Sequence, residues 1–518
     1  MSDGTFFAKG SSIRFLPLNR SACFRLLLAA LPAAALACSA GKDPTTAPTT
    51  ASDDVTSVEN TNVKSQAIAN CWLYATAGWV ESLHKGATAR DVDVSEAYWN
   101  YWYWYEEISG GDIAIDDAVT ASGVTQGGWW GLGAELIQRY GWMYEGDFLP
   151  NADAKAKRHE EAVAAINASL ASGALASPAA RRDPRIVRAE LNKAWGIDAT
   201  VVEDLERQFP VLPARKGAAP RPPVTDGGTD PTDAGAAPAE PLPESPVSLV
   251  SITDRAAGGS LGLTRIHAPQ ELQVIAADGT PTITLAEVIG TRAPNTRPGD
   301  GQRVGAEAWT EVRYTWSASD TARRTALLKN VQFALNQRLA VPMAWAVARN
   351  PSAGVYRGAG VSDFALTGLH ESILVDYEVE NVPGFGKLQV DVRETRPEAL
   401  EATLAEGASV TFFRIKNSWG VDPVWTPEEL RQFGLSPDDR SAAQKPNFLP
   451  SKPGFNDLFV DYLDVPTAWG GNLPNKHLAL RFALPTKLRF AIPEPTLLAA
   501  PDGGTPDGGV AEAGAGKK

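Results

Sequence analysis

The chain has 518 residues, which is enough for one large domain or two ordinary ones. An apolar fraction of 44% and 15 tryptophans exclude a wholly disordered protein, because such a composition supports a packed core. The formal net charge of −13 argues against nucleic acid, or an anionic membrane surface, as the main partner.

The N-terminus has the pattern of an export signal. Arginines at positions 14, 20 and 25 precede the apolar run 26–37, which is too short to span a bilayer stably. The run ends in Ala-Leu-Ala before Cys38, which resembles a bacterial lipobox, whose cysteine is lipidated and becomes the new N-terminus. We therefore expect residues 1–38 to be a signal peptide with lipidation at Cys38, and the protein to be anchored in a bacterial cell envelope, at the outer membrane, in the periplasm or at the cell surface. The alternative is an ordinary cleaved signal and a secreted protein.

The rest of the chain alternates between low-complexity and structured stretches. Residues 39–60 are polar and lack periodicity, which predicts a flexible tether. A folded domain is predicted over 61–492, with an insert at about 151–320. Within the insert, 214–246 is dominated by Pro, Gly, Ala and Asp and is predicted to be a disordered linker. The tail 493–518 has a similar composition and receives the same prediction.

The structured stretches differ in their periodicity. Residues 66–210 are predicted to be mainly helical, and 247–320 contains short alternating runs typical of strands. A helix followed by an apolar strand is predicted over 325–347, and strands dominate 366–420.

Seven of the eight residues at 98–105 are aromatic. They cover all sides of a helix, so some must either be exposed or meet another part of the protein. Two interpretations remain open at this stage: packing between helices in the core, and contact with a substrate or partner.

Cys71 is the one thiol outside the export segment, because Cys23 and Cys38 lie in or next to that segment. It follows Asn70, a good helix N-cap, and opens a run whose apolar residues share one helix face. A thiol at a helix start faces free N–H groups and the positive end of the dipole, which lowers its pKa. This position favours a catalytic thiol over a small buried apolar residue.

A reactive thiolate also needs an imidazole and a group that orients it. His370 opens a plausible strand, whereas other histidines stand in polar surroundings and are predicted to lie at the surface: His84, His159 and His267. His477 follows a loop and fits either description. Asn417 ends another strand, where its side chain can accept a hydrogen bond from the His370 ring, and Trp419 can shield that bond from water.

Cys-Trp at 71–72, a histidine that opens a strand and Asn-Ser-Trp-Gly at 417–420, in that order, resemble the papain family of cysteine peptidases. Cys-Trp-Leu-Tyr-Ala from position 71, Gly-Gly-Trp-Trp at 127–130 and a closing strand at 459–462 resemble its bleomycin hydrolase branch. The resemblance implies a two-lobe α+β fold, in which a helical lobe faces an antiparallel β-barrel-like lobe. The predicted insert lies between the lobes, and the active site lies in the cleft.

The same resemblance implies roles for individual residues. Cys71 is the implied nucleophile, His370 the base and Asn417 the residue that orients it. Gln66 is the implied oxyanion donor, although it lies five positions before the cysteine and the family has six; either the loop is shorter or the oxyanion hole is altered. The residues implied to bind substrate are Gly127, Gly128, Trp72 and Trp419.

The expected function is therefore hydrolysis of peptide bonds in a peptide or protein substrate, without metal, cofactor or nucleic acid. Two alternatives stay open. One is a transglutaminase-like acyl-transfer enzyme, against which Asn417 argues, because that class usually has Asp as its third residue. The other is a surface lipoprotein that kept the fold and serves as a binding module, which the altered spacing of Gln66 favours.

Overall fold

The computed structural model describes twelve stretches of the chain, all within the compact unit Ser52–Lys518. They are residues 58–111, 123–150, 155–211, 265–277, 282–315, 321–348, 354–358, 366–420, 449, 451–463, 479–487 and 489–493. Among these residues, no helix combines the length and the apolarity that a membrane crossing requires. The predicted signal peptide with Cys38, the linker 214–246 and His477 lie outside the described residues, as do nearly all of the predicted tether and tail.

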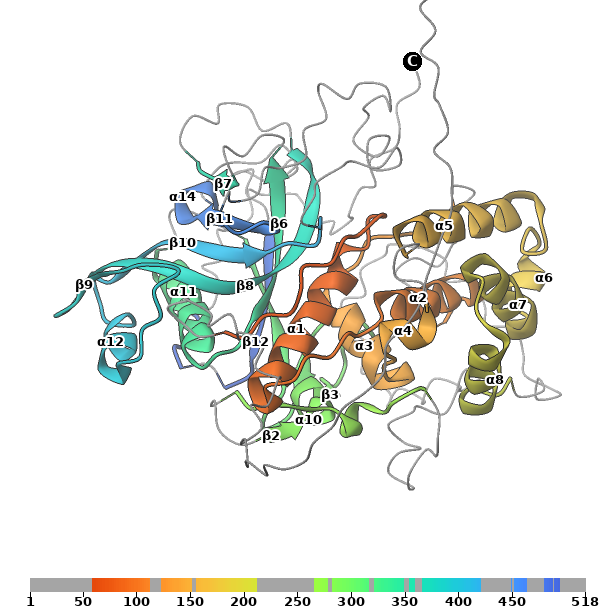
Figure 1. The fold of residues 1–518 in the computed structure, drawn as a ribbon, viewed down its shortest axis with the longest axis horizontal. Helices are drawn as coiled ribbons and strands as arrows, with labels where there is room; N and C mark the ends of the chain where they lie inside the picture. Colours follow the sequence, from red (N-terminus) through yellow and green to blue (C-terminus); the bar gives the residue numbers. More distant parts are fainter. Residues whose placement is uncertain are drawn as a thin grey trace, which may run out of the picture. The chain divides into compact units, whose positions relative to one another are not determined.

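Helix α1 (Cys71–Thr88) occupies the centre of the fold. It begins at Cys71, as predicted, and ends at Ala89, which adopts a left-handed conformation. Every residue from 72 to 83 is buried, so the helix is enclosed on all sides rather than along a single stripe. Figure 1 shows α1 between the strands of the main sheet and two further helices, α2 (Glu96–Ser109) and α3 (Trp130–Tyr140).

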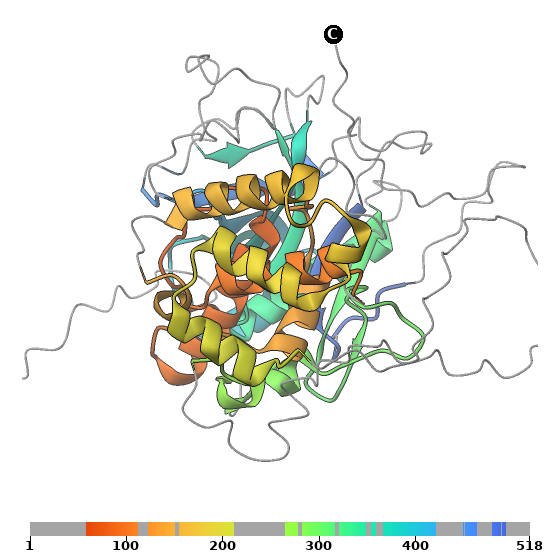
Figure 2. The same cartoon turned by 90° about the vertical axis from the view of Figure 1, so that its right-hand side faces the viewer.

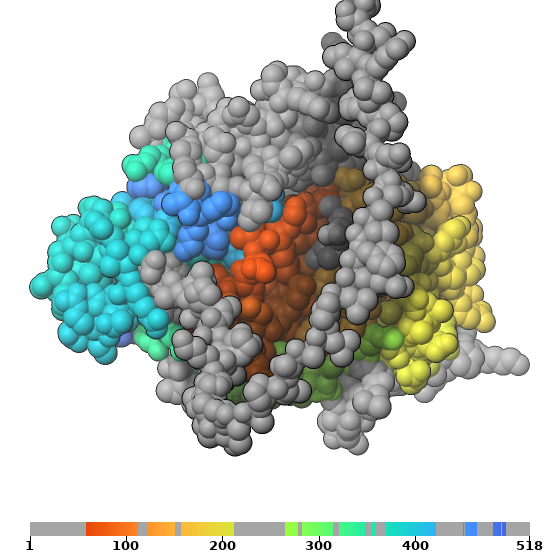
Figure 3. All heavy atoms as spheres, in the orientation of Figure 1, coloured from red at the N-terminus to blue at the C-terminus, as the bar shows by residue number. Residues whose placement is uncertain are grey.

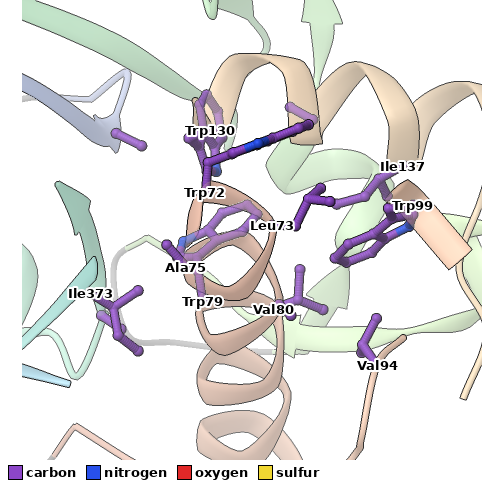
Figure 4. Close-up of a cluster of buried hydrophobic side chains, with 14 of the residues drawn as sticks. Trp72, Leu73, Ala75, Trp79, Val80, Val94, Trp99, Trp130, Ile137 and Ile373 are labelled. Carbon is purple, nitrogen blue, oxygen red and sulfur yellow. The ribbon is translucent and has the colours of Figure 1, made fainter. Parts of the chain in front are cut away.

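The core around α1 draws side chains from both the helices and the sheet. Figure 4 shows Ile373 of the sheet on one side of α1, and Trp99 of α2 with Trp130 of α3 on the other. The ring of Trp79 packs edge-on against Trp130, with centroids 5.5 Å apart. Because one continuous cluster includes residues of both regions, the packing of α1 couples them.

The aromatic cluster at 98–105 lies in α2 and is core. All seven rings are at most 5% exposed, which answers the question left open by the sequence in favour of packing between helices. Trp102 stacks on Tyr140 at 4.0 Å, and the Tyr98 hydroxyl donates to the Tyr140 carbonyl at 2.6 Å. Several of the buried polar ends find acceptors on the chain, such as the Trp99 N–H on the Gly141 carbonyl at 2.9 Å, whereas Trp102 Nε1 has none among the described residues.

Further short and medium helices continue the helical region: α4 (Glu145–Phe148), α5 (Lys155–Ser172), α6 (Pro178–Arg181), α7 (Pro184–Trp195) and α8 (Ala199–Gln208). Ser177, Asp183 and Asp198 cap the starts of α6, α7 and α8 with their side chains. Figure 2 shows the orange and yellow helices of this region side by side, and α7 contacts both α2 and α5. The predicted helices over 151–210 are therefore confirmed for the described part of the chain.

The next segment forms small antiparallel pairs, which confirms the predicted short strands. Its elements are η2 (Pro269–Glu271), β1 (Gln273–Ile275), β2 (Thr282–Thr284), α10 (Leu285–Ile289), β3 (Thr291–Arg292) and β4 (Arg303–Val304). β1 pairs with β2, and β3 with β4.

The main sheet of the described residues has eight strands: β5 (Trp309–Thr315), β6 (Val341–Ala348), β7 (Val355–Tyr356), β8 (Leu366–Val382), β9 (Gly386–Leu388), β10 (Ser409–Lys416), β11 (Phe455–Phe459) and β12 (Ala479–Pro485). The order is β5-β12-β6-β8-β10-β11-β7, and β9 pairs with β8. Helices α11 (Thr321–Asn336), α12 (Pro397–Ala402) and α14 (Val460–Leu463) accompany it. The fold is therefore α+β with a large mixed sheet.

Three details of the sheet differ from the sequence-based picture. The sheet is not purely antiparallel, because β7 and β11 run parallel. The closing strand lies at Phe455–Phe459, and the residues that follow, expected to be strand, form the short helix α14. The segment β5, within the range predicted as an insert, pairs with β12 at the edge of the main sheet.

Candidate active site

The centre of the candidate site is a contact between two neighbouring strands. β8 and β10 are antiparallel, with Ile373 opposite Lys416, so His370 near the start of β8 lies close to Asn417 just after β10. His370 Nε2 and Asn417 Oδ1 are 2.6 Å apart, and both residues are buried. The strand register thus places together two residues that are 47 positions apart.

A chain of hydrogen bonds fixes which atom of Asn417 faces the ring. Asn417 Oδ1 also accepts from the Ser418 N–H at 2.8 Å, and its Nδ2 donates to Asn456 Oδ1 at 3.1 Å. Asn456 Nδ2 in turn donates to the Gly354 carbonyl at 3.1 Å. Because a carbonyl only accepts, both amides have a single consistent orientation. His370 Nε2 must therefore carry a proton, and Nδ1 is the acceptor of the neutral ring.

Aromatic rings enclose this imidazole. Trp419 stacks on His370 with centroids 4.4 Å apart and an angle of 24°, and Trp345 packs edge-on at 5.9 Å. Burial lowers the pKa of His370 to about 4, although the bond to Asn417 acts in the opposite direction. The ring is accordingly neutral near pH 7. Trp419 itself is only 5% exposed, so it covers the His–Asn bond and presents little surface to a substrate.

Cys71 lies beside the same strand. It keeps some exposure, and the backbone N–H of Glu371, the residue after His370, hydrogen-bonds to the Cys71 thiol. The dehydrated surroundings of the sulfur nevertheless raise the pKa of Cys71 to about 12, and this effect outweighs the N–H groups. The expectation that the helix start lowers this pKa is therefore wrong for the structure as it stands, and thiol and imidazole are both neutral.

The residue before the nucleophile has an unexpected partner. Asn70 makes no side-chain capping bond to α1; its Nδ2 lies 3.4 Å from Nδ1 of His159. His159 belongs to α5, is fully buried and packs edge-on against Trp195 at 5.0 Å. The prediction of a surface position for His159 is therefore wrong. Helix α5 reaches the loop that carries the thiol.

Gln66 is held against the loop after β10. Its backbone N–H donates to the Ser418 carbonyl at 2.7 Å, and its Oε1 accepts from the Ser418 hydroxyl at 2.5 Å. Its Nε2 donates to the Ile68 carbonyl at 3.2 Å. A primary amide has two such hydrogens, so one is left for another acceptor.

The glycine pair adjoins the nucleophile helix. A Cβ on Gly127 would meet nothing within 4 Å, whereas one on Gly128 would come within 2.4 Å of the Trp72 ring. Trp72 is fully buried and donates to the Gln126 carbonyl at 2.9 Å, so it supports the strip from behind and the predicted direct contact with substrate is wrong. Gln126 Oε1 also accepts from the Ala69 N–H at 2.8 Å, and thereby ties the strip to the loop before Cys71.

Other residues of the site were missed by sequence reasoning, for reasons of context. Asn456 and Gln126 are ordinary polar residues in loop or strand contexts, and only the fold shows their partners. Glu371 carried one weak signal, a carboxylate directly after His370 and before the apolar run 373–375. In the described stretches, no group of His, Cys, Asp and Glu is arranged to hold a metal ion.

Two further described histidines, His84 and His267, make contacts outside this constellation. His84 Nδ1 is 2.7 Å from the Gln273 carbonyl, and His267 stacks on Trp142 at 4.5 Å. Both are partly exposed.

Comparison with known proteins adds little to this geometry. No protein-family model and no curated protein matches the chain. Among solved structures, the chain is similar to a crystal structure of PepW from Lactobacillus rhamnosis HN001 (DR20), with 12% identity, a TM-score of 0.37, and coverage of 85% of this chain and 82% of that chain. A likeness at this level carries no functional argument, so the function must be argued from the site.

Proposed function

We propose that this protein is a cysteine peptidase of the papain type, with a two-lobe fold whose helical lobe supplies Cys71 and whose sheet lobe supplies His370 and Asn417. One observation carries the proposal: the hydrogen-bond chain that assigns the Nε2 proton of His370 also leaves its Nδ1 as a base, on the strand that touches the thiol. Asn417 thus orients the ring without taking part in proton transfer.

The chemistry starts from a neutral pair. As the Cys71 sulfur attacks a peptide carbonyl, its proton passes to His370 Nδ1 and a C–S bond forms. The oxyanion accepts hydrogen bonds from the Cys71 backbone N–H and from the second amide hydrogen of Gln66. The C–N bond then breaks while His370 returns the proton to the leaving amine. Water, deprotonated by His370, releases the acyl group and restores the thiol.

The exposed backbone at Gly127 is proposed to pair with an extended substrate. Without a Cβ at this position, a peptide strand can approach the backbone closely. The contacts of Gln126 with Trp72 and Ala69 hold this strip at a fixed distance from the nucleophile. Binding and chemistry are therefore linked through the first turn of α1.

The test is hydrolysis of a fluorogenic peptide library by the full chain, with Cys71→Ala as the inactive variant. We expect amines to be released with wild type and essentially none with the variant. Formation of isopeptide bonds in place of released amines would favour the acyl-transfer alternative, against which Asn417 argues. Equal turnover by both proteins would show that Cys71 is not the nucleophile.

A second candidate is a binding module without catalysis. The high pKa of Cys71 favours it, because a thiol that stays protonated is a poor nucleophile. Labelling of Cys71 by an epoxide-type thiol reagent separates the two candidates. Labelling supports the peptidase, and an unreactive thiol in a protein that still binds peptides supports the module.

We also propose that the chain is exported and lipid-anchored through Cys38, in a bacterial cell envelope. The apolar run that ends at Ala37 supports this. Cys38→Ala is expected to move the protein from the membrane to the soluble fraction. An unmodified wild-type N-terminal peptide found by mass spectrometry would contradict it.

A further inference from the structure

Glu371 connects three parts of the candidate site. It follows His370 on β8, and its backbone N–H reaches the Cys71 thiol. Its side-chain Oε1 accepts from the Trp130 N–H at 3.1 Å. Strand, nucleophile and helix α3 therefore meet at a single residue, which none of the proposed catalytic steps uses.

The Glu371 carboxyl caps the start of α3 by accepting from the Trp130 N–H, although the two residues are far apart in the sequence. Trp129, at the N-cap position of α3, makes no side-chain capping bond. Helix starts leave N–H groups that need acceptors, and a carboxyl there is favourable. Glu371, which is 241 positions away, provides one. Since α3 directly follows the glycine strip, this cap fixes where the strip ends.

The surroundings of the carboxyl favour its neutral form. Glu371 is 4% exposed, and its Oε2 has no hydrogen-bond partner among the described residues. Burial first, and the nearby carboxylate of Glu311 second, raise the pKa of Glu371 well above its usual range, against the pull of Arg481 and of the Trp130 N–H. Glu311 is itself paired with Arg313 at 3.0 Å.

The remaining charged groups near Glu371 lie across a small cavity of about 20 Å³, which Glu371 lines together with Lys64, Glu81 and Lys416. Of these, Lys64 and Glu81 pair with each other at 2.6 Å. Lys416 Nζ donates to Thr61 Oγ1 at 2.8 Å, so both lysines of the cavity have other partners.

We propose that Glu371, as an uncharged carboxyl, is a positioning residue that holds the Cys71 thiol, the His370 strand and the start of α3 in one arrangement. The proposal rests on the proposed function and deepens it. An ionised Glu371 would place a negative charge beside the sulfur and oppose formation of the thiolate by raising the pKa of Cys71. A neutral carboxyl keeps the cap and avoids that cost.

The experiment compares Glu371→Gln and Glu371→Ala in the full chain, with Glu380→Gln as a matched control on the exposed part of the same strand. The first readout is the rate of Cys71 alkylation by iodoacetamide between pH 6 and 10, followed by mass spectrometry of the peptide that contains Cys71. This rate reports the thiolate whether or not the protein hydrolyses peptides, so a failure of the proposed function is distinguishable from a failure of this proposal.

Glu371→Gln keeps an acceptor for Trp130 but cannot ionise. Because the wild-type carboxyl is proposed to be uncharged, we expect the alkylation rate of this variant to match wild type within about twofold at each pH, and kcat/KM at pH 7 to stay within about threefold. Glu371→Ala loses the cap, and we expect KM to rise about tenfold with a smaller change in kcat. The control is expected to match wild type in both readouts.

An alkylation rate several-fold higher in Glu371→Gln than in wild type and Glu380→Gln would show that Glu371 is ionised, and would overturn the electrostatic part of the proposal. An unchanged KM in a folded Glu371→Ala would overturn the positioning part. If the alanine variant does not fold, the glutamine variant still decides, because it preserves the hydrogen bond.

Discussion

Two buried histidines, His370 of β8 and His159 of α5, belong to different elements near the nucleophile and differ in what holds them. His370 is bonded at 2.6 Å to an amide whose orientation is fixed by a chain of acceptors. His159 lies 3.4 Å from the Asn70 amide and packs against the Trp195 ring. The comparison shows that burial alone does not distinguish the two histidines, whereas a fixed proton position marks out His370, the proposed base. His159 is better placed to support the loop that ends at Cys71.

The largest expected difference between the two is in activity. His370→Ala removes the proposed base, so kcat/KM should fall by roughly 10²–10⁴-fold. His159→Ala should lower kcat/KM per folded molecule by less than about tenfold, because its contacts with Asn70, Tyr74 and Trp195 support the loop and helix around the thiol rather than the proposed proton transfer. Steady-state kinetics on protein of verified fold, with His84→Ala as the control, measures both. Equal losses of kcat/KM in His370→Ala and His159→Ala would show that the two histidines contribute alike to activity.

The second-largest loss of activity is expected when the orientation of the His370 ring is no longer fixed. Asn417→Ala should lower kcat/KM by roughly 10–1000-fold, since the ring then loses its preferred tautomer. Trp419→Ala should act in the same direction by admitting water to the His–Asn bond, and the two losses should not add. A double-mutant cycle on kcat/KM gives the coupling. Strictly additive losses would mean that the Trp419 ring and the His370–Asn417 hydrogen bond act independently.

A smaller effect is expected at His159, on the free energy of unfolding. His159→Ala leaves a cavity beside Trp195 and a buried Asn70 without this neighbour, and should lower the free energy of unfolding by about 2–4 kcal/mol. His84→Ala, at a partly exposed position, should cost less than about 1 kcal/mol. Urea denaturation at pH 7 measures both. Similar values for the two variants would place His159 outside the supporting core.

The smallest expected effect concerns pH. The pKa of His370 is about 4 in the folded protein and near 6.5 when unfolded, so the unfolded chain binds the proton more readily in this window. Stability from this residue is therefore full above about pH 6.5 and is lost as the pH falls towards 4. At pH 5.5 the loss should be about 1 kcal/mol, and His370→Ala should remove it. Denaturation curves at pH 7 and 5.5 for both proteins check this.

The sequence predicts those parts of the site that depend on local pattern. The helix beginning at Cys71 and the strands that carry His370 and Asn417 follow from periodicity and from recurrent motifs, and the structure contains them. His159 is different, because it stands among Arg158, Glu160 and Glu161 in a helix that looks solvent-exposed.

Burial of such a residue is decided by which distant element packs on that helix, and a single sequence does not specify this. The same holds for Glu371, whose partner in α3 is 241 positions away. Trp72 illustrates the opposite error, since the motif that contains it suggested contact with substrate, whereas its neighbours in the fold enclose it fully. Figure 3 shows the red-orange segment that includes α1 reaching the surface beside blue atoms from the C-terminal part of the chain, a meeting of remote segments that periodicity does not predict.

The separation of Cys71 and His370 along the chain has a consequence for biosynthesis. Their positions differ by 370 − 71 = 299 residues. A ribosome that adds about 5–20 residues per second needs roughly 15–60 s to pass from one to the other. During that interval the thiol exists without the strand that supplies its imidazole and the Glu371 N–H. The nascent chain therefore carries this cysteine as an ordinary thiol, without its proposed base, until the strand around His370 has been made.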